Sequence, residues 1–412
     1  MGAGDAGMTV PMKSDLAEHW SLDPEISFLN HGSFGATPSV ILKEQTKFRR
    51  QMEKDPVRFF ESDFPELWEA SRVSASKFLN ADLDGMALVT NTTTGVNTVM
   101  RSLQLNEGDE VIVPNHSYQA CWNAVDFVTS RAGAKTVVVD IPFRVKDSQE
   151  IIELVMESVT ERTVLALIDT VTSPTGIRMP FEDLTERLQG MGVDVLLDAA
   201  HGPGIVPLNL EEIDAAYCTG NFHKWVCTPK GSAFLHIRRD KKGIIRPLSI
   251  SHGASFEGSE QDKFEFEFGW PGTRDPTAWL CIPAAIDFME GMVGGGWPEI
   301  MLKNHELAVE GRRIICEAIG TTSPVPESMV SAIASVEIPS NDEVGPISLD
   351  GDPFHHLLLG KYGIQVPVFP WRHHGTRYIR ISAQLYNHID EYIFLAEALS
   401  EILSDEETIQ GR

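Results

Sequence analysis

Short apolar runs alternate with amphipathic stretches through the middle of the chain. The runs that read as strands are 86–90, 110–113, 136–139, 164–168, 193–197, 215–219 and 232–237. Helical patterns such as 147–159 and 181–191 lie between most of them. Strands that alternate with helices predict a mainly parallel sheet covered by helices on both faces. The close spacing of the last runs indicates some antiparallel pairing there.

A Gly/Pro-rich break at 293–298 (Val-Gly-Gly-Gly-Trp-Pro) follows a helical pattern over 276–292. Beyond it the chain predicts helices over 299–319 and 389–403 and strands over 332–338 and 378–382. A flexible loop inside one domain is the alternative for this break. We predict an N-terminal arm over 1–35, a large domain over 36–293 and a small C-terminal α+β domain over 294–412.

Composition agrees with a large folded protein. The 412 residues are 42% hydrophobic and 23% charged, enough for two domains with substantial cores. With 59 acidic and 34 basic residues the formal net charge is −25, which should repel nucleic acid and anionic membranes. No apolar run reaches the roughly 18 residues of a membrane span, and the first residues do not resemble a signal peptide.

The cysteines are scattered without the paired spacing of metal or redox motifs. They are Cys121, Cys218, Cys227, Cys281 and Cys316. This pattern is typical of reduced, mostly buried thiols, and it predicts a cytoplasmic protein. No set of metal ligands is predicted.

An acid and a lysine follow neighbouring predicted strands. Asp198 ends the run 193–197, and Lys224 comes soon after the run 215–219. This order suggests a site for pyridoxal phosphate (PLP). The lysine would form a Schiff base, and the acid would keep the pyridine nitrogen of the cofactor protonated. Two unrelated charges near strand ends are the alternative, because such a pair is common.

Four other segments offer polar groups near predicted strands. The segment 90–97 opens a helical pattern whose first N–H groups could bind phosphate, although an ordinary capped helix has the same pattern. His116 could stack on a cofactor ring, and hydroxyls of 172–176 could bond its phenolic oxygen; otherwise both segments are plain loops. Arg380, inside a strand pattern, suits a carboxylate ligand or a structural ion pair.

In this order the segments resemble the class V aminotransferase family of fold-type I PLP-dependent enzymes, and within it the isopenicillin N epimerase-like branch. The matching segments are 29–35, 91–97, 115–118, 173–176, 198–204, 220–225, 272–275 and Arg380. The resemblance implies an α/β fold with a large domain, built on a mainly parallel seven-stranded sheet, and a smaller C-terminal α+β domain. It also implies PLP as cofactor, a small amino acid as substrate and a homodimer as the active unit.

The resemblance assigns roles by position. The implied catalytic residues are Lys224, Asp198 and His116, with the His116 ring stacked on the cofactor. The implied cofactor-binding residues are Thr93, Thr94, His116, Ser173, Asp198, His201, Asn221, His223, Lys224 and, from a partner subunit, Thr273. The implied substrate-binding residues are Arg380, for the carboxylate, and Asn30 and His31, at the mouth of the site.

The resemblance to the isopenicillin N epimerase-like branch favours an epimerase or racemase, with a Cβ–S lyase acting on a cysteine-derived substrate as the alternative and an aminotransferase third. After Lys224 removes the α-proton, reprotonation on the opposite face gives epimerisation, loss of a β substituent gives C–S lyase chemistry, and reprotonation on the cofactor gives transamination. An epimerase needs a second acid, for which Tyr118, His31 and His252 are candidates. A PLP-binding protein without catalysis is the remaining class, but it would be expected to lack the lysine or the acid.

One departure from the family pattern narrows the chemistry. Cysteine desulfurases in this family carry a nucleophilic cysteine shortly before the carboxylate-binding arginine. No cysteine lies between Glu317 and Arg380. We therefore do not expect persulfide chemistry on a cysteine of this enzyme.

Overall fold

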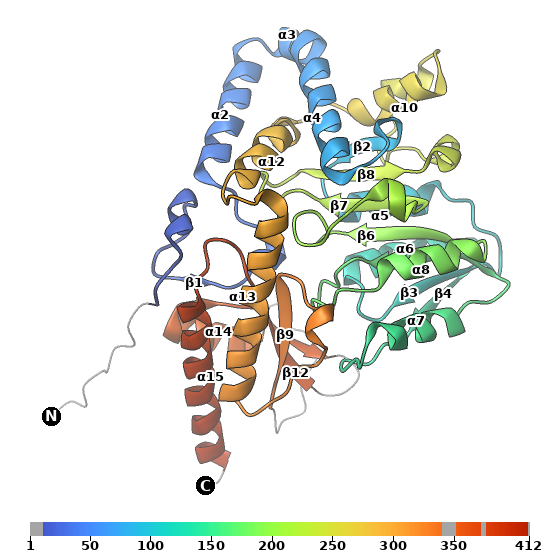
Figure 1. Ribbon diagram of the computed structural model, residues 1–412. Helices are drawn as coiled ribbons and strands as arrows, with labels where there is room; N and C mark the ends of the chain where they lie inside the picture. Colours follow the sequence, from blue (N-terminus) through green and yellow to red (C-terminus); the bar gives the residue numbers. More distant parts are fainter. Residues whose placement is uncertain (1–10, 340–351, 372–375, 411–412) are drawn as a thin grey trace.

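The computed structural model describes residues 11–339, 352–371 and 376–410, and its centre is a seven-stranded sheet (Figure 1). The strands, in sheet order, are β2 (Met86–Val89), β8 (Ala233–Ile237), β7 (Tyr217–Asn221), β6 (Asp194–Ala199), β5 (Thr163–Asp169), β3 (Glu110–Pro114) and β4 (Lys135–Val139). Strands β4, β3, β5, β6 and β7 are parallel, whereas β8 runs antiparallel to both β7 and β2. The predicted strands and the predicted antiparallel pairing are both confirmed.

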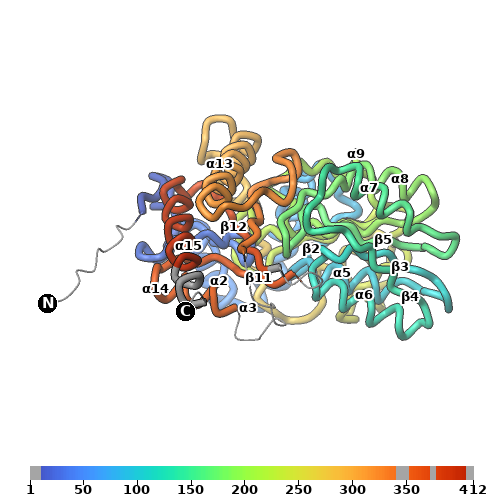
Figure 2. Tube along the Cα trace, turned by 90° about the horizontal axis from the view of Figure 1, so that it is seen from below, coloured from blue at the N-terminus to red at the C-terminus, as the bar shows by residue number. Residues whose placement is uncertain are grey.

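Alternate residues of each central strand enter two separate cores. In β5, Leu165 and Leu167 pack with α5 (Thr92–Ser102) and α6 (Gln119–Ala132), whereas Ala166 and Ile168 pack with α7 (Ser148–Glu157) and α8 (Phe181–Gly190). Figure 2 shows α5 and α6 on one side of the sheet and α7 and α8 on the other. Each fully buried Leu- or Ile-sized side chain contributes about 1.5–3 kcal/mol. Burial on both faces explains why these strands read as continuous apolar runs.

Helices before and after the sheet region cover its β2 end (Figure 1). The chain leads through α2 (Ser39–Lys54), α3 (Pro56–Arg58) and the π-helical turn η2 (Phe59–Asp63) into α4 (Phe64–Leu79). The prediction of a single helix over 276–292 was wrong in one respect. The segment forms two helices, α11 (Thr277–Leu280) and α12 (Ile282–Glu290). Pro283 lies in the first turn of α12, where its missing N–H is tolerated, so the helix restarts there.

The C-terminal part has its own antiparallel sheet, in the order β11 (Val368–Trp371), β12 (Thr376–Ser382) and β9 (Ile333–Ile338). The helices α13 (Gly296–Ala318), α14 (Pro353–Tyr362) and α15 (Ile389–Gln410) accompany it (Figure 1). The arm joins this part, because β1 (Ser27–Phe28) pairs with β10 (Ile364–Gln365). The domain limits stay a prediction, and residues 1–10 of the predicted arm lie outside the described residues. In the described chain no helix combines the length and apolar character needed to cross a bilayer.

Candidate active site

A cavity of about 440 Å³ opens at the carboxyl ends of the central strands. Asp169 of β5 and Asp198 of β6 are register partners there, and Lys224 follows the end of β7. The volume is in the range of small-molecule sites. The cavity is lined by Ser33, Phe34, Thr90, Asn91, Thr92, Thr93, Tyr118, Cys121, Asp169, Ser173, Asp198, Ala200, His201, Asn221, His223, Lys224, Lys230, Gly231, Phe369 and Arg380.

The amine of Lys224 is buried in this cavity. Its Nζ lies 3.0 Å from Nε2 of His201. Burial lowers the pKa of Lys224 to about 7; the positive charge of Arg380 acts in the same direction, and the charge of Asp198 opposes it. A neutral amine is both a nucleophile and a base, so Lys224 is available for either role near neutral pH.

Two buried carboxyl groups stand beside the lysine. Asp198 accepts hydrogen bonds from the N–H of Ala200 (2.9 Å) and the thiol of Cys121 (3.2 Å), and Asp169 accepts one from the Ser117 hydroxyl (2.5 Å). Burial raises the pKa of Asp198. Burial and then the charge of Asp198 raise the pKa of Asp169 well above its usual range. The two acids therefore do not ionise together easily, and a cationic ring nitrogen next to Asp198 would favour its charged form.

Asp169 was missed as a site residue in the sequence analysis. The signal was present, because Asp169 follows the predicted strand 164–168 just as Asp198 follows 193–197. Acids that end two adjacent parallel strands lie at the same edge of the sheet.

The N-terminus of α5 borders the cavity. Asn91 caps this helix by accepting from the N–H of Thr94 (2.8 Å), and Asn221 accepts from the N–H of Thr92 (2.9 Å). The side chains of Thr93 and His223 line the cavity, and the positive end of the helix dipole favours an anion here. Thr94 does not line the cavity, because the Asn91 cap holds both its N–H and its hydroxyl.

Arg380 of β12 reaches the opposite side of the cavity. It is 2% exposed, and its guanidinium donates to the carbonyl of Ser173 and to the hydroxyl of Ser33 (3.0 Å). Its Nε has no hydrogen-bond partner, and among the described residues no acidic side chain forms an ion pair with it. Burial of a charge without a counter-ion costs several kcal/mol, so this arginine is poised to bind an anion.

Two predicted site residues, His116 and His31, lie outside the cavity lining. The His116 ring is fully buried against Trp371 (4.5 Å between ring centroids), and its nitrogens contact Thr175 and the carbonyl of Ile141. It does not line the cavity, so stacking on a cofactor stays a prediction. His31 does not line the mouth either, because its ring is turned inward and contacts the Tyr386 hydroxyl and the Lys224 carbonyl, both at 2.9 Å.

The remaining predicted residues divide by position. Asn30 lies outside the cavity lining, and its Oδ1 accepts from the guanidinium Nη2 of Arg380 at 3.5 Å. Thr273 is exposed and outside the cavity lining. Of the three candidates for a second acid only Tyr118 lines the cavity, since His252 belongs to a separate groove with Trp68.

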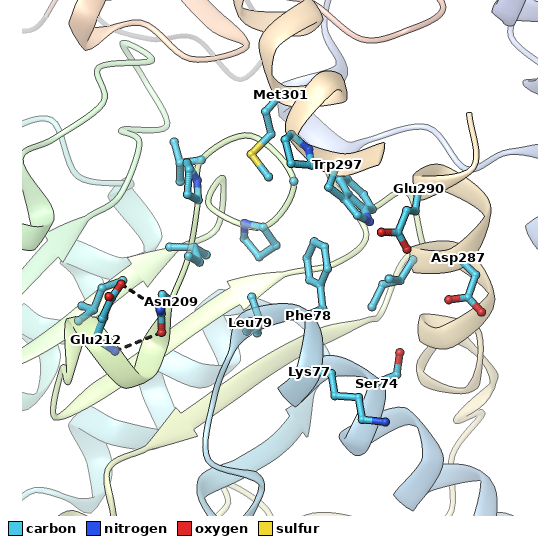
Figure 3. Close-up of a pocket in the computed structure, with 18 of the residues that line it drawn as sticks. Ser74, Lys77, Phe78, Leu79, Asn209, Glu212, Asp287, Glu290, Trp297 and Met301 are labelled. Atoms are coloured by element: carbon cyan, nitrogen blue, oxygen red, sulfur yellow. Dashed lines mark hydrogen bonds between the residues drawn. The ribbon is translucent and has the colours of Figure 1, made fainter. Parts of the chain in front are cut away.

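A larger cavity of about 650 Å³ lies between α4, α12 and the start of α13 (Figure 3). Phe78, Trp297 and Met301 give it an apolar wall, and Glu290 comes from α12 (Figure 3). Its one amine, Lys77, is exposed, and no buried base faces it among the described residues. We therefore place the chemistry in the smaller cavity.

The smaller cavity fits pyridoxal phosphate. Lys224 offers an amine for the aldehyde, Asp198 an acid for the ring nitrogen, Ser173 a hydroxyl for the phenolic oxygen and the N-terminus of α5 a phosphate site. Arg380, which has no acidic partner among the described residues, then remains for the carboxylate of a substrate.

Comparison with known proteins agrees with this fit. The model of the family "Aminotransferase class-V" matches residues 30–339. The chain is 30% identical to an L-cysteine desulfhydrase from Arabidopsis thaliana, over 97% of this chain and 92% of that protein. It is also 30% identical to an isopenicillin N epimerase from Amycolatopsis lactamdurans, over 94% of this chain and 98% of that protein. Its fold matches the cystine C–S lyase C-DES, solved with its product cysteine persulfide, at a TM-score of 0.75, 19% identity and coverage of 91% and 97%.

The lowered pKa of Lys224 predicts how cofactor attachment depends on pH. When PLP is added to the cofactor-free protein and trapped with borohydride, the rate of labelling should rise with pH around a midpoint near 7. Only the neutral amine attacks the aldehyde, so an ordinary lysine would give a midpoint near 10.4. Peptide mapping should locate the label on Lys224. Lys230→Gln removes the other amine of the cavity and is the matched control. This variant should still be labelled on Lys224. A label on Lys230, or a midpoint near 10, contradicts the assignment.

Proposed function

The chain belongs to the class V aminotransferase family, and from this premise we propose that it is a PLP-dependent lyase that cleaves the Cβ–S bond of a cysteine-derived amino acid. Family membership and the similarity to these relatives make the protein a PLP-dependent enzyme that acts at the α-carbon of an amino acid. What needs argument is the bond that breaks after the α-proton has been removed.

The observation that carries the proposal is that Lys224 is the one buried amine in the cavity lining among the described residues, with a pKa lowered to about 7. β-Elimination needs one base at the α-carbon and room for a departing sulfur, whereas epimerisation needs a second acid on the opposite face. Of the candidates for that acid, two lie outside the cavity lining. The similarity to a plant L-cysteine desulfhydrase supports the same reaction.

Each cavity residue then has a defined task. Arg380 binds the α-carboxylate through parallel N–H groups and so fixes the substrate. Asp198 holds the proton of the ring nitrogen, and bound PLP supplies the electron sink for the negative charge at the α-carbon. Lys224 takes the α-proton at Nζ, the Cβ–S bond breaks, and the sulfur leaves with the bonding pair. For cysteine the balance is cysteine and water to hydrogen sulfide, pyruvate and ammonia.

Epimerisation is the second candidate. The Tyr118 side chain lines the cavity and is 45% exposed, so its hydroxyl is free to approach a bound substrate. The similarity to an isopenicillin N epimerase supports this alternative. Transamination is the third, and the same product analysis distinguishes it.

Product analysis in deuterated water separates these reactions. With L-cysteine and S-alkyl cysteines we expect thiol or sulfide and pyruvate in equal amounts. Tyr118→Phe should leave this yield within about twofold, because elimination does not require the phenol. A D-amino acid with deuterium at the α-carbon, formed without thiol and lost in Tyr118→Phe, would establish epimerisation instead. A keto acid that keeps the substrate's sulfur would establish transamination.

The role of Arg380 predicts a split between binding and cofactor loading. Arg380→Lys keeps the charge but loses the planar fork, so KM should rise about 10- to 100-fold. The visible absorbance of bound PLP should not change. Arg377→Lys is the matched control on the same strand, because Arg377 already pairs with Asp352 (3.1 Å) and should tolerate the change. An unchanged KM in Arg380→Lys would refute carboxylate binding by this residue.

We propose a homodimer in which Thr273 completes the phosphate site of the partner subunit. Support comes from its exposed position outside its own cavity and from exposed apolar side chains nearby in sequence, Leu248, Ile250, Phe256 and Phe266. A mixture of Lys224→Ala and Thr273→Asp chains should regain about a quarter of the parent sites, since random pairing gives one intact site in half of the dimers. Neither variant should be active alone. An active monomer would refute the arrangement.

We also propose that the substrate of this site is a small amino acid. We propose that the protein is located in the cytoplasm. Five free, buried thiols support a reducing compartment. Fractionation that recovers the chain from an organelle would contradict the location.

A further inference from the structure

His201 stands between a tryptophan and the cofactor lysine. The indole N–H of Trp225 donates to Nδ1 of His201 (3.2 Å), and Nε2 of the same ring lies 3.0 Å from Nζ of Lys224. All three side chains are buried, with exposed fractions of 1%, 0% and 9%. The line from indole to imidazole to amine is continuous, and His201 and Lys224 also line the cavity.

The indole N–H of Trp225 determines which nitrogen of His201 is protonated, and this in turn determines which protonation state of Lys224 fits. An indole N–H can only donate, so Nδ1 of His201 must carry a lone pair. A neutral imidazole has one N–H, and it therefore lies on Nε2, facing Lys224. A lysine ammonium has three N–H donors and no acceptor, so it would oppose another donor there. Only the neutral amine has a lone pair that accepts from Nε2–H.

We propose that Trp225 is a positioning residue that fixes the tautomer of His201 and through it holds Lys224 as the neutral, nucleophilic amine. The proposal rests on Lys224 as the cofactor lysine, but it does not depend on which bond the enzyme breaks. The two can fail separately, because the tautomer is measured without any turnover.

The electrostatic surroundings favour the same state. Burial lowers the pKa of His201 well below its usual range, which excludes an imidazolium that would place a second donor against the indole. The charged or titratable groups that act on Lys224 or His201 from the surrounding elements are Asp198, Cys121, Arg380, His31 and His223. Of these, Asp198 and Cys121 favour a charged lysine, and Arg380 opposes it.

The indole has little freedom to turn away. Its ring packs against His31 (4.8 Å between centroids). Gly204 adopts φ +89°, and a Cβ there would lie 3.2 Å from the Trp225 backbone and 3.0 Å from the Trp297 ring. The backbone of Trp225 is thus closely packed, and its ring is packed against His31.

The tautomer of His201 also affects how readily Lys224 gives up a proton that it has taken from the substrate. A lysine that has taken up a proton faces the Nε2–H of His201, and this contact of two donors makes the added proton easier to give up. Loss of the proton from Nε2 of His201 and uptake of one at Nδ1 would remove the conflict, but the indole N–H disfavours that tautomer.

The experiment reads the tautomer directly in the full-length, cofactor-free chain. Long-range ¹H–¹⁵N spectra of the histidine-labelled protein should show His201 protonated at Nε2 and unprotonated at Nδ1; the signal is identified by its loss in His201→Gln. In Trp225→Phe, the Nδ1–H tautomer should become populated. The midpoint of Lys224 labelling should then rise by about one pH unit, because Nε2 can accept from the ammonium.

Trp20→Phe is the matched control. It also removes a buried indole N–H, one that donates to the Ala36 carbonyl (3.2 Å), and it should change neither readout. If Trp225→Phe does not fold, a benzothienyl analogue of tryptophan at residue 225 keeps the ring and replaces the N–H by sulfur. His201 protonated at Nδ1 in the parent chain would overturn the proposal. So would an unchanged tautomer and midpoint in a folded chain that lacks the indole N–H.

Discussion

An amine removed from water loses the hydration that stabilises its charge, and the site is arranged around one amine in that condition. Lys224 is enclosed where parallel strands end, so its pKa falls to about 7. The same enclosure determines its neighbours. It raises the pKa of Asp198, which a nearby cation would lower again, and within the described part of the chain it leaves Arg380 without a counter-ion. Each buried charge is costly alone, so the cavity is stabilised when a molecule with a ring nitrogen, a phosphate and a carboxylate completes it.

The sequence predicted most of the sheet, and that Asp198 and Lys224 lie at one edge of it, for one physical reason. Strands buried on both faces leave apolar runs, and parallel strands bring their carboxyl ends to one edge. The order of the strands therefore suggested Asp198 and Lys224 as neighbours, and the family motifs around them supported it. The helix over 276–292 was predicted as one element because a proline in a first helical turn does not interrupt the apolar pattern. Asp169 had the same signal as Asp198 but no family motif to draw attention to it.

Side-chain directions could not be predicted in this way. His31 and His116 follow loops whose residues can turn toward the cavity or away from it, and both rings are turned toward partners far along the chain, Tyr386 and Trp371. The contact of Trp225 with His201 is of the same kind, because it joins two loops that no periodic pattern relates. His252 looked equivalent to Tyr118 in the sequence, yet only Tyr118 lies beside Lys224. Such contacts depend on packing between loops.

The contact between His31 and Tyr386 also has a consequence in time. These residues are 355 positions apart, and the His31 ring bonds the Lys224 carbonyl as well. At usual rates of translation, His31 leaves the ribosome about 20 to 70 seconds before Tyr386. Before the C-terminal part has been made, the strand β1 lacks its partner β10. The His31 ring, which contacts the Lys224 carbonyl, then lacks its contact with Tyr386. The growing chain can form its central sheet early, but the cofactor chamber closes only when nearly the whole protein has been made.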